Sequence, residues 1–243
     1  MYQAVGDVIL SHSLLLSFPE VDKKRTALTG ISWGGVLTSV ATSLDHRFRA
    51  AVPVYGCGFL AESGRMKQQL DKLSLLERET WIKQYDPSVY LSRAKCPVLF
   101  LNGTNDVHFY LPSMTQSAAL VSKGQVLIKY KLRHGHGHGW NNQEIGTFID
   151  HYLCNGPALP KIKSLRLQDN ILSVKAVSSS PVQKVVLYYT TDTNVEQEKC
   201  EWHFVEAVPS GKEWKVELPQ KVVRWFVNVT DNSGNQLSGD LQE

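Results

Sequence analysis

The sequence predicts an α/β protein: a parallel sheet with helices on both faces, followed by a small all-β sandwich. In the first 155 residues, short apolar runs alternate with helical patterns of ten or more residues, which is typical of βαβ units. Beyond residue 156, apolar and polar residues alternate with a period of two, as in strands. The chain has 243 residues, of which 42% are hydrophobic, enough to bury one large core or two smaller ones.

The N-terminal elements follow from hydrophobic spacing. Residues 2–18 are predicted to form an amphipathic helix that ends before Pro19. A strand over about residues 25–31, a helix over 33–43 and a second strand over 48–55 follow. Residues 66–90 read as a more polar helical segment whose apolar side is formed by Leu70, Leu73, Leu76, Trp81 and Ile82.

The second half of this alternation repeats the pattern. A third strand is expected over residues 96–101 and a fourth over 125–132, with helices over 112–123 and 142–153. Six or seven short strands then occupy about 85 residues, the size of an immunoglobulin-like or fibronectin-like sandwich. We therefore expect two domains, residues 1–155 and 156–243.

Composition excludes several classes of partner. The net charge is +3 and no run is rich in Lys or Arg, so nucleic acid is not an expected partner. No apolar run reaches the length of a membrane span, and the first segment lacks the basic start and cleavage site of a signal peptide. The four cysteines are scattered without a C-x-x-C pair, which favours free thiols over disulfides or zinc. The compartment is left open.

The stretch from Gly30 to Gly34 contains the pattern G-x-S-x-G between a predicted strand and a predicted helix. This arrangement predicts a nucleophile elbow, in which Ser32 lies on a tight turn with its hydroxyl exposed. The positive N-terminal end of the next helix points at the same place. The alternative interpretation is a Gly-rich loop with an ordinary serine.

Asp106 and a histidine cluster follow the third and fourth predicted strands. Because the carboxyl ends of parallel strands meet at one edge of a sheet, both should lie near Ser32. A histidine could take the Ser32 proton while Asp106 orients the ring. Asp106 could instead be a turn residue.

The histidine cluster leaves a second question open. His134, His136 and His138 alternate with glycines, so an extended segment would project all three to one side, as a metal site also would. No Asp, Glu or Cys lies nearby in sequence to support bound zinc, so we expect no metal and no cofactor.

Three stretches resemble α/β-hydrolases of the prolyl oligopeptidase and acetyl xylan esterase type, which include dienelactone hydrolase-like proteins. They are residues 30–35, residues 102–106 and the Gly-His-Gly step within 134–139. The resemblance implies a partial α/β-hydrolase sheet, with Ser32 as nucleophile, Asp106 as triad acid and His136 as base. His134 is the alternative base, and the Trp33 backbone N–H is an oxyanion donor.

In that family several strands precede the nucleophile, whereas only one helix and one strand precede Ser32 in this sequence. The loop that normally gives the second oxyanion donor is likewise not among these residues. The strand before Ser32 is therefore expected at an edge of the sheet, where it would seek a partner. We expect a homo-oligomer.

The resemblance implies a serine carboxylesterase acting on small acyl esters, such as acetylated carbohydrates. Two alternatives stay open. One is a serine peptidase of the prolyl oligopeptidase type. The other is a truncated or degenerate hydrolase with a binding role, through Trp202, Trp214 and Trp225.

Overall fold

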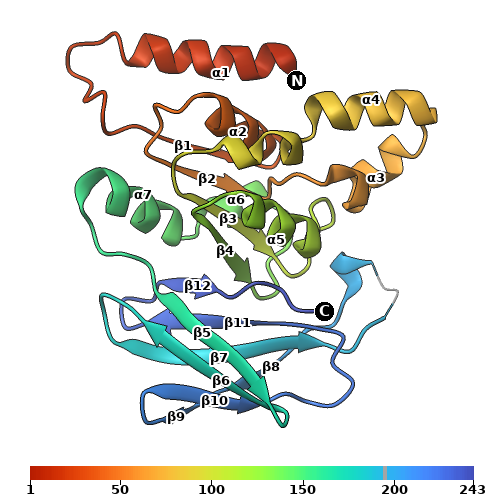
Figure 1. Ribbon diagram of the computed structural model, residues 1–243, viewed down its shortest axis with the longest axis vertical. Helices are drawn as coiled ribbons and strands as arrows, with labels where there is room; N and C mark the ends of the chain where they lie inside the picture. Colours follow the sequence, from red (N-terminus) through yellow and green to blue (C-terminus); the bar gives the residue numbers. More distant parts are fainter. Residues whose placement is uncertain (194–195) are drawn as a thin grey trace.

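Two sheets organise the chain (Figure 1). The computed structural model describes residues 1–193 and 196–243. The described residues form an eight-stranded sheet with the order β1-β2-β3-β4-β12-β11-β7-β8 and a four-stranded sheet with the order β5-β6-β10-β9.

The first four strands are parallel and form the predicted α/β half. They are β1 (Ala27–Ile31), β2 (Ala50–Val54), β3 (Val98–Gly103) and β4 (Gly124–Lys129). Every residue of β2 and β3 is buried. Such strands need cover on both faces, which explains their continuous apolar runs. The predicted α/β class is confirmed.

Seven α-helices among the described residues accompany these strands. They are α1 (Tyr2–Leu15), α2 (Trp33–Leu44), α3 (Gly64–Leu70), α4 (Leu75–Tyr85), α5 (Leu111–Leu120), α6 (His136–Trp140) and α7 (Glu144–Cys154). Helix α2 packs on β1 and β2, α5 packs on β3 and β4, and α7 packs on β2. None of the helices described is both long enough and apolar enough to cross a lipid bilayer.

The polar segment 66–90 differs from its prediction. It forms two separate helices, because Ser74 starts α4 with a capping box in which its hydroxyl accepts from the Glu77 backbone N–H. The predicted apolar side is wrong at Leu73 and Leu76, which are exposed, whereas Leu70 is buried. Helical spacing places residues on a common face without deciding what covers that face.

The remaining strands form the C-terminal half. They are β5 (Lys161–Gln168), β6 (Ile171–Val177), β7 (Val182–Thr190), β8 (His203–Glu206), β9 (Val208–Ser210), β10 (Glu213–Glu217), β11 (Arg224–Asp231) and β12 (Gln236–Ser238). Leu172 of β6, Leu187 of β7 and Val227 of β11 belong to one buried apolar cluster, which therefore draws on both sheets. A cluster shared in this way is expected between the two layers of a sandwich.

One layer of this sandwich is joined to the parallel sheet. Strand β12 pairs antiparallel with β4, where Ser238 is opposite Val126. The cluster around the parallel strands also includes Trp202, Phe226 and Leu237 from the C-terminal half. The division near residue 156 stays a prediction, since one sheet and one apolar core extend across it.

The three tryptophans considered for ligand binding lie in or against apolar clusters. Trp202 is buried in the larger core, and Trp214 and Trp225 pack against the sandwich cluster. These positions account for them as packing residues.

Candidate active site

Ser32 lies on the turn between β1 and α2, and its backbone is strained. Its φ of 58° and ψ of −120° place a non-glycine residue in the left-handed half of backbone space. A Cβ added at Gly30 would lie 2.3 Å from the Gly34 carbonyl oxygen, so the turn requires glycine there. The Ser32 backbone N–H donates to the Val54 carbonyl at 2.8 Å, which ties the turn to β2. The local geometry is that of a nucleophile elbow.

Asp106 follows β3 and is completely buried. Its Oδ1 accepts hydrogen bonds from two backbone N–H groups of its own loop, His108 at 2.6 Å and Phe109 at 2.9 Å. The loop therefore wraps around one oxygen of the carboxylate and leaves Oδ2 for another partner.

His134 connects this carboxylate to the serine. Its Nδ1 is 2.8 Å from Asp106 Oδ2, and its Nε2 is 3.0 Å from Ser32 Oγ. The carboxylate can only accept, so Nδ1 carries the proton and Nε2 is free to accept from the serine hydroxyl. Ser32 and Asp106 thus come together as predicted from their places after parallel strands, with His134 between them.

The geometry contradicts the choice of His136 as base. His136 is exposed, and its ring centroid lies 6.1 Å from that of His134. The expected extended arrangement of the three histidines is also wrong, because α6 begins at His136 and carries His136 and His138 into solvent. Only His134 precedes this helix.

Gly139 explains the path of α6. Its N–H donates to the Gly135 carbonyl at 2.8 Å, which closes the helical turn. A Cβ at Gly139 would lie 2.5 Å from Ile31 Cδ1 and 2.6 Å from the Tyr55 ring, so α6 packs tightly over the ends of β1 and β2. One signal in the sequence favoured His134: it is nearer to the carboxyl end of β4.

The rings of Tyr55 and His108 lie nearest to that of His134, and sequence reasoning did not assign either to the site. The Tyr55 ring lies 4.7 Å from that of His134, and the Tyr55 hydroxyl donates to the Arg133 carbonyl at 3.1 Å. Burial and the nearby Asp106 charge raise the pKa of Tyr55 to about 12, so it remains a neutral donor. The His108 ring packs edge-on against His134 at 4.5 Å. The pKa of His108 is lowered mainly by burial and to a smaller extent by the nearby charge of His134.

Helix α2 starts beside the serine. Trp33 is its first residue, so the Trp33 backbone N–H has no acceptor within the helix and lies at the positive end of the helix dipole. The role of the Trp33 N–H as oxyanion donor stays a prediction. Throughout residues 1–193 and 196–243, no three His, Cys, Asp or Glu side chains are grouped so that they could hold a metal ion.

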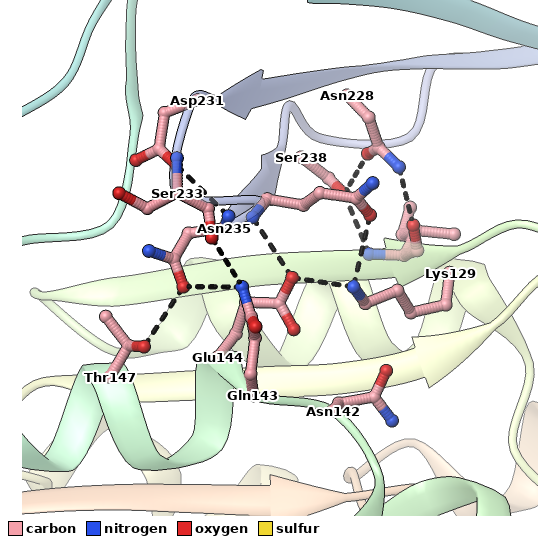
Figure 2. Close-up of polar contacts among 12 residues, drawn as sticks. Lys129, Asn142, Gln143, Glu144, Thr147, Asn228, Asp231, Ser233, Asn235 and Ser238 are labelled. Carbon is pink, nitrogen blue, oxygen red and sulfur yellow. Dashed lines mark hydrogen bonds and ion pairs between the residues drawn. The ribbon is translucent and has the colours of Figure 1, made fainter. Parts of the chain in front are cut away.

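The loop that carries His134 is closed at its base by an ion pair (Figure 2). Lys129, at the end of β4, places Nζ 2.6 Å from Oε1 of Glu144, the first residue of α7. Gln236 of β12 contacts both: its backbone N–H donates to Glu144 at 3.0 Å, and its side-chain oxygen accepts from Lys129 at 3.1 Å. Glu144 is 1% exposed. No local pattern in the sequence marked these residues.

The prolyl oligopeptidase family model matches residues 2–151, more than half of the chain. The chain belongs to the prolyl oligopeptidase family. The matched range includes Ser32, Asp106 and His134 and ends before the C-terminal strands.

Several solved structures share this fold. A puromycin-hydrolysing peptidase from Mycobacterium tuberculosis is 24% identical with a TM-score of 0.52, over 62% of this chain and 25% of its own. An acetyl xylan esterase from Paenibacillus sp. R4 is also 24% identical with a TM-score of 0.52, over 62% of this chain and 52% of its own. An acylaminoacyl peptidase from Pyrococcus horikoshii is 23% identical with a TM-score of 0.51. The match covers 61% of this chain and 28% of the peptidase.

The chain therefore spans between a quarter and about half of the length of these structures. No curated protein is similar enough to the chain to count as a match.

Proposed function

We propose that this protein is a serine hydrolase that cleaves acyl compounds through Ser32, His134 and Asp106, with short-chain carboxylic esters as substrates. One observation carries the proposal: the unbroken series of contacts from Ser32 Oγ to His134 Nε2, and from His134 Nδ1 to Asp106 Oδ2. Family membership and the strained serine turn support it.

The reaction follows from these contacts. As Ser32 Oγ forms a bond to the substrate carbonyl carbon, its proton passes to His134 Nε2, and the carbonyl oxygen becomes an oxyanion that the Trp33 N–H can bind. Collapse breaks the bond to the leaving alcohol, which takes the proton from His134. Water then attacks the acyl-enzyme by the same route and releases the acid. Asp106 accepts the hydrogen bond from His134 Nδ1 and stabilises the His134 cation.

Esters are proposed first because an alkoxide leaves more readily than an amine, so an ester demands less stabilisation from the site. The likeness to an acetyl xylan esterase is in accord with this choice. A peptidase is the second candidate, supported by the family itself and by the likeness to a puromycin-hydrolysing peptidase.

Hydrolysis of a chromogenic acetyl ester, measured beside hydrolysis of an aminoacyl anilide, separates the two candidates. We expect the ester to be cleaved faster, and the Ser32→Ala variant to cleave neither. Faster cleavage of the anilide would favour the peptidase. If neither is cleaved and a fluorophosphonate does not label Ser32, the remaining alternative is a degenerate hydrolase with a binding role.

A further inference from the structure

Gln197 is a buried glutamine whose side chain extends from the C-terminal half to the acid loop. We use this name for residues 104–111, which follow β3 and include Asp106. It begins the short 3₁₀ helix η4 (Gln197–Lys199), in the connection between β7 and β8, and is 2% exposed. Its Nε2 donates to the Asp106 and Phe109 carbonyls, each at 3.2 Å, and its Oε1 accepts from the Leu111 backbone N–H at 2.6 Å. Both donors of the amide and its acceptor oxygen are used on one loop.

These bonds act on the backbone that shapes the Asp106 site. The carboxylate is held by the N–H groups of His108 and Phe109, so its position depends on the course of residues 106–109. Gln197 binds the carbonyl groups at both ends of that same short segment.

A neighbouring contact extends the same attachment. The Asn105 side-chain amide donates to the Cys200 carbonyl at 2.9 Å and to the Glu198 carbonyl at 3.3 Å. The segment 197–200 is therefore bonded to the acid loop on both sides of Asp106. Because the donors and the acceptor of the buried Gln197 amide are all hydrogen-bonded, these contacts favour a single backbone arrangement.

We propose that Gln197 is a positioning residue for Asp106, and that the C-terminal sandwich is thereby part of the apparatus for hydrolysis rather than an appended module. This inference rests on the proposed function. Gln197 acts through Asp106, whose loop it binds, and not on the reacting atoms. Because His134 depends on Asp106 for its orientation, a displaced acid loop should slow the chemical step more than it weakens substrate binding.

The test compares Gln197→Met with Thr190→Val. The first keeps the length of the side chain but removes all three bonds. The second is an isosteric change at a fully buried residue that ends β7, and removes a bond to the Asp192 backbone N–H. Both loosen the same connection, but only Gln197 binds the acid loop. We expect Gln197→Met to lower kcat by about ten- to a hundredfold with little change in KM, and Thr190→Val to leave kcat near the wild-type value.

Two further measurements separate positioning from general destabilisation. In a double-mutant cycle, Gln197→Met should have little further effect once Asp106→Asn is present, because both act through one group. Hydrogen exchange should increase in residues 105–111 of Gln197→Met and not of Thr190→Val. Equal effects of both variants on kcat, or an additive cycle, would overturn the proposal while the wild-type enzyme remains active. An inert wild-type protein with an unlabelled Ser32 would overturn the proposed function and this inference with it.

Discussion

At the scale of single residues, the histidines differ in what holds them. His134 is fixed by a carboxylate on one side and a hydroxyl on the other, whereas His136 lies at the exposed start of a helix. A short change in backbone path therefore separates two residues that look alike in sequence.

We expect His134→Ala to lower kcat by about three or more orders of magnitude, because no other ring is hydrogen-bonded to Ser32 in the part of the chain that the structure describes. His136→Ala should change kcat by less than about tenfold. Steady-state kinetics on the acetyl ester, with circular dichroism to check folding, gives the comparison. A greater loss of kcat in His136→Ala than in His134→Ala would indicate that His136 is the base.

Another histidine, His12, is buried and supports the fold away from the site. His12 of α1 contacts Asp45 at 2.7 Å and Thr26 at 2.9 Å, and its ring stacks on Phe48. Burial disfavours the charge of Asp45, but hydrogen bonds from Arg47 and His12 outweigh it and hold the pKa of Asp45 at about 2.

Because the pKa of Asp45 is depressed in the folded state, its contribution to stability is present above the unfolded value near 4 and is lost as pH falls toward about 2. We expect Asp45→Asn to lower the free energy of unfolding by about 1 to 2 kcal/mol at pH 7. The difference from wild type should shrink below about pH 4. Urea unfolding at pH 7, 4 and 3 measures it, and a difference that is constant over this range would contradict the assignment.

At the scale of elements, the loop between β4 and α7 is held at its two ends. The Lys129–Glu144 ion pair joins these ends (Figure 2). Gln236 of β12 is hydrogen-bonded to both side chains. Removing one member of a buried pair leaves the other charge uncompensated, which usually costs more than the pair contributes.

We therefore expect Glu144→Gln to lower the free energy of unfolding by about 2 to 4 kcal/mol and to lower kcat as the His134 loop loosens. Asp71→Asn, which removes an exposed partner of Lys67, should cost less than about 1 kcal/mol. Urea unfolding and ester kinetics on both variants test this. Similar losses in the two variants would show that the buried pair does not anchor the loop.

At the scale of the whole molecule, the edge of the larger sheet at β1 is the side where we expect a second copy of the chain to bind. Strand β1 is the terminal strand of the larger sheet and pairs with β2. Helix α1 packs on α2 at this side (Figure 1). Its Tyr2, Leu10 and Leu14 side chains are exposed. Terminal strands and exposed apolar side chains both favour contact with another chain.

The homo-oligomer stays a prediction, and it is assigned to this side of the molecule. We expect light scattering at low micromolar concentration to give a mass above that of one 27.3 kDa chain. The double variant Leu10→Glu, Leu14→Glu should shift the mass toward the monomer, since it places charges on the exposed face of α1. A wild-type monomer at this concentration would contradict the prediction.

The sequence alone determined features that depend on near neighbours. The G-x-S-x-G pattern predicted the turn at Ser32, and Gly30 gives the physical reason, because a Cβ there would lie 2.3 Å from the Gly34 carbonyl oxygen. The change from helical to twofold spacing near residue 156 predicted where helices give way to strands, since each spacing places apolar groups on one face of its own element. The place of Asp106 at the edge of the sheet was predictable because it closely follows a buried strand.

Only the tertiary structure decided which groups meet across long separations in the chain. The bond between His134 and Ser32 joins residues 102 positions apart, and that between Gln197 and Asp106 joins residues 91 apart. Such contacts depend on how β4 leads into α6 and on how β12 pairs with β4. In the histidine cluster, three residues have the side chain that a base requires, and only one of them contacts Ser32. Local spacing cannot choose among them, because the choice depends on the packing of elements whose positions are set by the whole chain.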